Sequence, residues 1–402
     1  MNRDSLKLRV RLMAVLALAL ILIGCAAGRN IKTAQQPVSS PPSLIDASVG
    51  KATCEAIAQD FSEGDLQSII SRVDSSFLTW RVLKLFEKNP LTHEQTESIE
   101  KNLSDQLINM LSLTEERTRW SMLSGRVDGE RYLCLVRSGL SNEGVKYVEF
   151  DLRLVDDRLR ILDWYDLIRK ARVSDLFVEL FRDIDEIAFA HLVALPNVRA
   201  SVAQEQKLYA DFLKAARSGD AERVLKIYAK LPSRLQNKPL YIFIALNMAS
   251  KLDVARYGSF LRDLARRVGD DDRYGMLLLD LYLADRQYEK ADRVLRAFKR
   301  QIGSDAVLEL LLANLERARG NKQAFYGYCL QALEADAAQL DTYWILLDQF
   351  VADRNYGDAV LILNVLSSMF QITLDDNALE SDEKYQDFFR SAAFKEWMEK
   401  AT

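Results

Sequence analysis

The residue best placed for chemistry near the start of the chain is Cys25, because its thiol can be acylated. It follows an uncharged apolar run from Leu12 to Gly24, and four basic residues lie within the first 11. A basic start followed by a short apolar run is typical of a secretory signal, and an ordinary membrane-spanning helix needs about 20 apolar residues. The small Gly24 gives a peptidase access to the bond before Cys25. The pattern therefore predicts export, and cleavage before Cys25 would leave its thiol available for acylation.

The sequence Leu22-Ile23-Gly24-Cys25 resembles the lipobox of bacterial lipoproteins. The resemblance implies a signal peptide over residues 1–24 and an acylated Cys25 that binds the lipid bilayer; an uncleaved signal anchor is the alternative. In that family an Asp after the Cys commonly signals inner-membrane retention. Ala26 occupies this place, which favours the outer membrane facing the periplasm. Three of the seven prolines fall in residues 25–50, so we expect a flexible tether there.

The charge of the chain argues against nucleic acid as a partner. The formal net charge is −4, and removing residues 1–24 takes away four basic residues and one acidic residue, which leaves −7. A mildly acidic chain without a basic block is a poor ligand for nucleic acid, and the same balance argues against an electrostatic membrane-surface role beyond the lipid.

Three more cysteines follow the predicted lipidation site: Cys54, Cys134 and Cys329. An odd count in an oxidising compartment leaves at least one thiol unpaired. Cys54 and Cys134 fall in the same predicted domain and could form a disulfide. Alternatively, all three are buried as small apolar residues, and the sequence leaves both possibilities open.

Residues 51–190 predict an α+β domain, with helices packed on a four-stranded antiparallel sheet. Apolar residues recur at helical spacing up to Leu111. The last of the helices they predict begins with a capping box at Thr92 and runs to about Leu111. Apolar and polar residues then alternate, which is typical of half-buried strands. Four strands are expected, joined by tight turns at Asp128-Gly129 and Asp156-Asp157, and they cover residues 119–126, 130–137, 148–154 and 158–164. An amphipathic helix over 174–188 ends the domain.

The order of these elements resembles the nuclear-transport-factor-2-like cone or a cystatin-like roll. Enzymes of the cone type usually place Asp, His or Tyr in its mouth, so the resemblance implies candidates at the end of the last strand: Asp163, Trp164, Tyr165 and Asp166. The alternative is that the aromatic pair closes the core and the aspartates lie in a turn. His93 and His191 are the only histidines, and neither has a partner at catalytic or metal-binding spacing. The sequence therefore indicates no enzyme, no cofactor and no metal.

Residues 200–371 predict an all-α region with a 34-residue repeat, counted from Asp272, Ala306 and Leu340. The seventh, eighth and twenty-fourth places are then apolar in each unit, and Ala291 and Ala359 share the twentieth. Two antiparallel helices per unit must stack on their neighbours to bury these residues. A unit from Lys238 fits loosely, and an earlier hairpin is expected to turn at Gly219.

This repeat resembles the tetratricopeptide repeat, which implies a helical-hairpin solenoid with a concave face. Phe325 departs from the family because Ala usually occupies its place, so we expect looser packing in the middle unit. By resemblance, the concave face is a candidate protein-binding groove, and its residues are Arg273, Met276, Asp280, Leu310, Asn314, Arg317, Trp344 and Asp348. Its mixed charge favours a mixed or apolar peptide anchored near Trp344.

The segment 372–402 predicts a helix with an aromatic stripe, which either caps the open end of the stack or binds a partner. The sequence as a whole predicts a membrane-anchored lipoprotein that serves as a protein–protein interaction scaffold in the bacterial envelope. The alternative is a small-molecule-binding or weakly enzymatic lipoprotein that uses a polar pocket near Asp163 and Tyr165.

Overall fold

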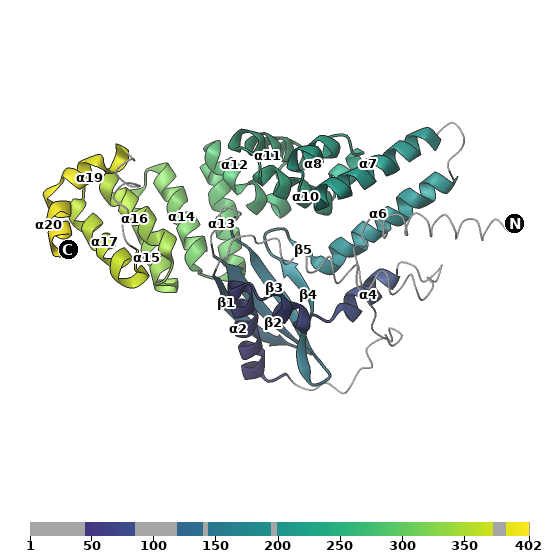
Figure 1. The fold of residues 1–402 in the computed structure, drawn as a ribbon, viewed down its shortest axis with the longest axis horizontal. Helices are drawn as coiled ribbons and strands as arrows, with labels where there is room; N and C mark the ends of the chain where they lie inside the picture. The colour runs from purple at the N-terminus through teal and green to yellow at the C-terminus, as the bar shows by residue number, and fades with distance from the viewer. Residues whose placement is uncertain (1–44, 85–118, 140–143, 194–198, 373–382, 402) are drawn as a thin grey trace. The chain divides into compact units, whose positions relative to one another are not determined.

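The computed structural model describes residues 45–84, 119–139, 144–193, 199–372 and 383–401. The chain forms two compact units, Met1–Leu281 and Tyr282–Thr402, so the boundary falls inside the short helix α12 (Leu279–Ala284). Cys25, His93 and the helix expected after Thr92 lie outside the described residues. The predicted order, an α+β domain followed by a helical region, is confirmed (Figure 1).

The sheet of the N-terminal unit is an antiparallel meander of five strands in the order β1-β2-β3-β4-β5. The strands are β1 (Trp120–Asp128), β2 (Arg131–Ser138), β3 (Tyr147–Val155), β4 (Arg158–Asp166) and β5 (Ala171–Arg172). Both predicted turns are present, with positive φ at Gly129, Asp156 and Asp157. The expectation of four strands was wrong by one, because β5 is only two residues long and too short to show an alternating pattern.

Among the described residues, four helices pack against the sheet: α2 (Ala47–Glu63), α3 (Leu66–Arg72), α4 (Ser75–Leu83) and α6 (Val173–Val193). Helix α2 ends at Gly64, whose φ of 71° is the left-handed conformation that glycine adopts most easily. Asp65 then caps α3 through its side chain. Alternate residues of β3, including Phe150 and Leu152, face the core together with apolar residues of these helices.

A disulfide joins α2 to β2 in the middle of this core. It links Cys54 and Cys134, whose Cα atoms lie 5.8 Å apart and whose side chains are completely buried. Of the two possibilities that the sequence left open, the structure therefore shows the bridged pair. Cys329 is free and buried, and burial raises the pKa of its thiol to about 12.

Helical hairpins follow the sheet within the same unit. They are α7 (Arg199–Arg217) with α8 (Ala221–Tyr228), and α10 (Pro239–Ser250) with α11 (Val254–Val268), with the single-turn α9 (Ser233–Gln236) between them. Gly219 turns the first hairpin with a φ of 70°, as predicted. Short 3-10 turns, η2 (Asp272–Tyr274) and η3 (Met276–Leu278), lead to α12.

Helix α6 connects these hairpins to the sheet. Its Asp183 is fully buried, accepts a hydrogen bond of 2.7 Å from the Tyr241 hydroxyl and pairs with Lys238. Lys170, just before β5, donates to the Asp272 carbonyl at 2.9 Å. These contacts explain why the first hairpins belong to the same compact unit as the sheet, although the sequence pattern changes near residue 200.

In its described residues, the C-terminal unit contains five successive helices and then shorter helical segments. They are α13 (Tyr288–Ile302), α14 (Ala306–Arg319), α15 (Lys322–Ala335), α16 (Leu340–Ala352), α17 (Tyr356–Phe370), η4 (Glu383–Tyr385), α19 (Gln386–Arg390) and α20 (Ala392–Ala401). Figure 1 shows α14 to α17 side by side as two antiparallel pairs. Helical hairpins are therefore the building unit of this region.

The spacing of the helices follows the predicted 34-residue period. The second helix of each hairpin begins at Val254, Tyr288, Lys322 or Tyr356, so successive starts are one period apart. The turn before three of them repeats in the backbone, with positive φ at Arg286, Gly320 and Arg354. The next N–H donates back five positions, from 287 to 282, 321 to 316 and 355 to 350, at 2.7 to 2.9 Å. The hairpin from Lys238 fits the sequence pattern loosely, but its second helix begins at Val254, 34 residues before Tyr288.

The repeat positions that the sequence predicted to be apolar are buried. Their exposed fraction is 7% or less, and they are Leu278, Leu279, Ala291, Leu295, Leu312, Ala313, Cys329, Leu346, Leu347, Ala359 and Leu363. Phe325 lies at the twentieth place of the middle unit and is buried as well, with 1% of its surface exposed. These apolar positions are therefore covered by neighbouring helices, as stacking of hairpins requires.

Candidate functional site

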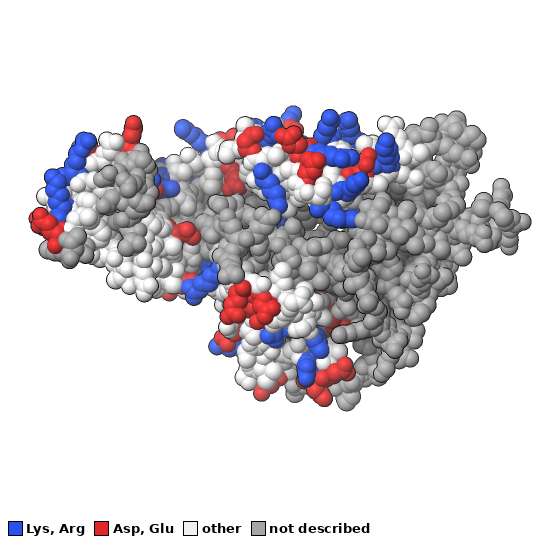
Figure 2. Space-filling model, viewed as in Figure 1, with Lys and Arg blue, Asp and Glu red and all other residues white. Residues whose placement is uncertain are grey.

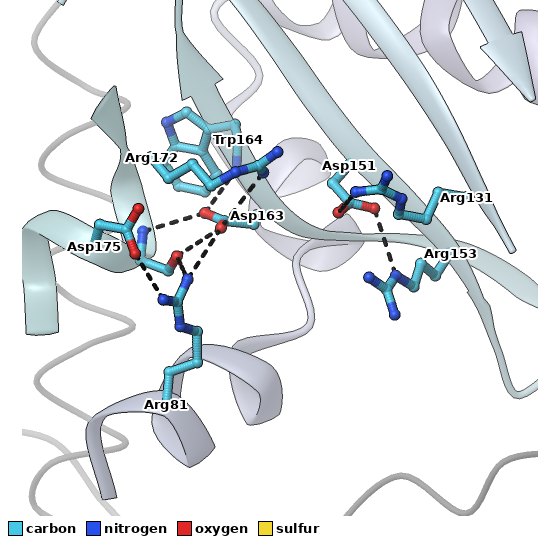
Figure 3. Close-up of polar contacts among 9 residues, drawn as sticks. Arg81, Arg131, Asp151, Arg153, Asp163, Trp164, Arg172 and Asp175 are labelled. Carbon is cyan, nitrogen blue, oxygen red and sulfur yellow. Dashed lines mark hydrogen bonds and ion pairs between the residues drawn. The ribbon is translucent and has the colours of Figure 1, made fainter. Parts of the chain in front are cut away.

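The strongest polar cluster in the N-terminal unit surrounds Asp163 on β4 (Figure 3). Its carboxylate accepts hydrogen bonds from the Ser174 hydroxyl at 2.6 Å, the Ser174 N–H at 3.1 Å and the Trp164 N–H at 2.9 Å. Burial raises the pKa of Asp163, while the bonds from Ser174 favour its charged form. Because Ser174 lies in the first turn of α6, the carboxylate satisfies one backbone N–H that the helix leaves free.

Two arginines complete this cluster from neighbouring elements. Arg81 of α4 and Arg172 of β5 place a guanidinium nitrogen 3.9 and 3.8 Å from the Asp163 carboxylate. Arg81 also bonds to Asp175 at 2.6 Å and to the Ser174 hydroxyl. These contacts join α4, β4, β5 and α6, so the cluster fixes the position of α4 and α6 against the sheet.

The other three candidates at the end of β4 have different surroundings. Trp164 belongs to the core, where its ring lies 6.1 Å from that of Phe150. Tyr165 is half-buried, with the Arg172 guanidinium 5.9 Å from its ring centre, and burial raises the pKa of its hydroxyl. Asp166 accepts hydrogen bonds from the N–H groups of residues 168 and 169 at 3.0 and 2.9 Å. Trp164 is therefore a core residue, and Asp166 stabilises a turn. Asp163 lies on β4 and contacts the first turn of α6.

A second buried carboxylate, Asp151, lies opposite Asp163 in the register of β3 and β4. It is 3.5 Å from a guanidinium nitrogen of Arg131 and 3.5 Å from one of Arg153 (Figure 3). The sequence pattern did not predict this pair of aspartates, because charged residues alternating with apolar ones indicate a solvent-exposed face. A bulge in β4 next to Asp163 was not readable from the pattern either.

The candidate groove residues are divided between the two units. In the N-terminal unit, Arg273 is exposed and binds Asp271 at 2.7 Å, Met276 is half-buried, and Asp280 accepts a hydrogen bond of 3.0 Å from the Tyr257 hydroxyl. The Arg273 guanidinium lowers the pKa of Asp271. Arg273 is thus exposed, with its charge balanced locally.

The remaining groove candidates lie in the C-terminal unit. Leu310 is buried, with 2% of its surface exposed, and Asn314 is half-buried. Arg317 is exposed and donates to the Asn314 side chain at 3.1 Å. Leu310 is therefore a core residue, while Arg317 and Asn314 form one polar pair on α14.

Trp344 and Asp348 are engaged by the end of the chain itself. Trp344 packs against a cluster that includes Tyr385 and Phe388. The Asp348 carboxylate accepts a hydrogen bond from the Tyr385 hydroxyl and pairs with Lys384 at 3.1 Å. Residues 384–388 therefore contact two residues that the sequence had assigned to partner binding.

The described part of the chain contains no group of three or more His, Cys, Asp or Glu that could hold a metal ion. His191 falls in α6. None of the described helices is both long and apolar enough to cross a bilayer.

The comparisons with known proteins give no family for this chain. It has no significant match among protein-family models, curated proteins or solved structures. Its function must therefore be inferred from its own residues and geometry.

Proposed function

We propose that this protein is a bacterial lipoprotein, acylated at Cys25 and held at the outer membrane facing the periplasm. The Leu22-Ile23-Gly24-Cys25 sequence and the basic, apolar start of the chain support the proposal. The disulfide between Cys54 and Cys134 supports it independently, because structural disulfides persist in oxidising compartments such as the periplasm.

The proposed role is that of a protein–protein interaction scaffold built on tetratricopeptide-like repeats. The observation that carries it is the recurrence of helical hairpins with a 34-residue period, with the same backbone turn at Arg286, Gly320 and Arg354. Stacked hairpins of this kind offer an extended surface from their first helices, to which a peptide or a partner helix can bind. Arg317 and Asn314 on α14 are the exposed and half-buried polar residues that we assign to this surface.

The alternative role, small-molecule binding or weak catalysis in the α+β domain, has less support. The carboxylate of Asp163 already accepts three hydrogen bonds and lies near two arginines. A general acid or base must instead reach a substrate proton.

Photo-crosslinking in the native bacterium tests the scaffold role. A photoreactive amino acid at Arg317, on the first helix of a hairpin, is expected to capture a discrete partner protein. The same amino acid at Ser367, an exposed position on the second helix α17, serves as the matched control. Equal capture at both positions, or capture at neither, would contradict a groove on the first helices.

Fatty-acid labelling with membrane fractionation tests the anchor. Cys25→Ser is expected to abolish labelling and leave an unprocessed precursor, whereas Cys329→Ala leaves both labelling and membrane recovery unchanged. Wild-type protein that retains its first methionine and carries no fatty acid would refute the lipoprotein assignment.

A further inference from the structure

Charge is distributed unevenly along the chain. Residues 199–268, which form α7 to α11, contain 14 Lys and Arg against six Asp and Glu, a net charge of +8. The C-terminal unit, residues 282–402, contains 14 Lys and Arg against 20 Asp and Glu, a net charge of −6. The acidic total of the whole chain therefore conceals one strongly basic segment, which the whole-chain argument against an electrostatic membrane-surface role did not take into account.

Local contacts engage the carboxylates of this segment. Asp211 pairs with Arg223 at 3.7 Å, Glu222 pairs with Arg256 at 2.5 Å, and Glu205 and Asp263 each bind an arginine. Asp220 caps α8 by accepting from a backbone N–H at 3.1 Å. The acidic residues thus neutralise four arginines and cap helix ends, and the excess positive charge is carried by the remaining arginines and by lysines.

Four of these lysines define one face of the first hairpin, here named the lysine face: Lys207, Lys214, Lys226 and Lys230. All four are exposed, and none forms a salt bridge within the described residues. Lys207, Asp211 and Lys214 are spaced four and three positions apart on α7, and Arg223 and Lys226 are three apart on α8, so each set shares a helix face. Lys230 follows in the turn after α8. The Asp211–Arg223 pair joins the two sets across the hairpin. Figure 2 shows Lys and Arg gathered over this part of the molecule, with Asp and Glu among them.

We infer that the lysine face binds the anionic phospholipid headgroups of the bilayer to which the chain is tethered. Lysine ammonium groups are flexible point charges, which suit a diffuse field of phosphates. Near a membrane surface each such charge adds to the attraction to anionic lipid. The inference rests on the proposed anchor, because α2, the first helix after the predicted tether, belongs to the same compact unit as α7 and α8. A lipid anchor would keep this unit close to the headgroups and so raise their effective concentration.

Co-sedimentation with vesicles tests the inference. The unlipidated chain from residue 26 onward, which keeps every described residue, is mixed with vesicles of phosphatidylcholine alone or of equal parts phosphatidylcholine and phosphatidylglycerol. We expect binding only to the anionic vesicles, with a decrease as salt is raised. Lys226→Glu with Lys230→Glu is expected to weaken binding by about tenfold or more. Arg300→Glu with Lys395→Glu makes the same change in charge on exposed residues of the C-terminal unit and is expected to leave binding unchanged.

Three results would overturn the inference: no preference for anionic vesicles, an equal loss of binding in both double variants, or tighter binding to duplex DNA at the same salt. Because the chain used here carries no lipid, failure in this assay leaves the acylation of Cys25 untouched. Conversely, a chain that binds anionic vesicles but is never labelled with fatty acid would refute the proposed anchor alone.

Discussion

The α+β domain and the C-terminal repeats are stabilised by contacts of very different range along the chain. In the domain, the disulfide joins residues 80 apart, and Arg81 bonds to Ser174 across a separation of 93. In the C-terminal unit, Lys299 pairs with Glu309 ten residues away, and even the contact from Tyr385 to Asp348 spans only 37. Long-range contacts cost more loop-closure entropy, which makes the domain the part that needs a covalent crosslink.

The largest expected difference between the two regions is their response to loss of the disulfide. Replacing Cys54 and Cys134 by Ser should lower the unfolding free energy of the N-terminal unit by about 4 kcal/mol, because so long a crosslinked loop restricts the unfolded chain strongly. Hydrogen exchange measured by mass spectrometry should show lost protection in β1 to β4 and unchanged protection in α14 to α17. Equal loss in both regions would show that the units do not unfold independently.

A buried ion pair ranks second. Asp183→Ala should destabilise the N-terminal unit by about 3 kcal/mol, because it leaves Lys238 and the Tyr241 hydroxyl without their buried acceptor. Asp211→Ala removes the exposed pair with Arg223 and is expected to cost less than about 1 kcal/mol. Urea unfolding of both variants makes the comparison, and similar costs would contradict a structural role for Asp183.

Glycine substitutions should have opposite signs in the two regions. A Cβ at Gly125 on β1 would lie 2.1 Å from the Tyr132 hydroxyl, so Gly125→Ala should destabilise the sheet by about 2 kcal/mol. Gly327 in α15 has open space around it, so Gly327→Ala should stabilise the C-terminal unit by about 0.5 kcal/mol. Thermal unfolding of the two variants tests both expectations. In a Tyr132→Ala background, Gly125→Ala should lose most of its destabilising effect, because the clashing hydroxyl is gone.

The smallest expected effect is on how the unfolding free energy depends on pH. Two aspartates, Asp353 and Asp163, should change it in opposite directions. A hydrogen bond from Lys322 lowers the pKa of Asp353 in the C-terminal unit. Its stabilisation is therefore present above the unfolded pKa near 4 and is lost as the pH falls through the folded value. Burial raises the pKa of Asp163, so its contribution becomes less favourable as the pH rises from the unfolded pKa through the folded one. Unfolding of Asp353→Asn and Asp163→Asn across acid pH should thus show changes of opposite slope.

Much of the fold was predictable because its signals are local. The alternation in β3, the glycine turns and the 34-residue spacing each lie within a short stretch, and the described structure confirms the elements they predict. The two-residue β5, the bulge beside Asp163 and the buried Asp151 were missed, because each arises from pairing with a distant strand. The groove was predicted less well than the repeat, since Leu310 is buried and residues 384–388 engage Trp344 and Asp348.

The sequence by itself determined the approximate positions of the longer strands and of the helical repeat, which residues of each repeat are apolar and which cysteine could carry lipid. Periodicity, turn chemistry and short motifs act between neighbours along the chain, so these features are readable locally. Only the tertiary structure decided that Cys54 meets Cys134, that Asp163 holds the start of α6 and that the chain's own end occupies Asp348. These outcomes depend on residues tens of positions apart coming within bonding distance, which packing determines and local pattern does not.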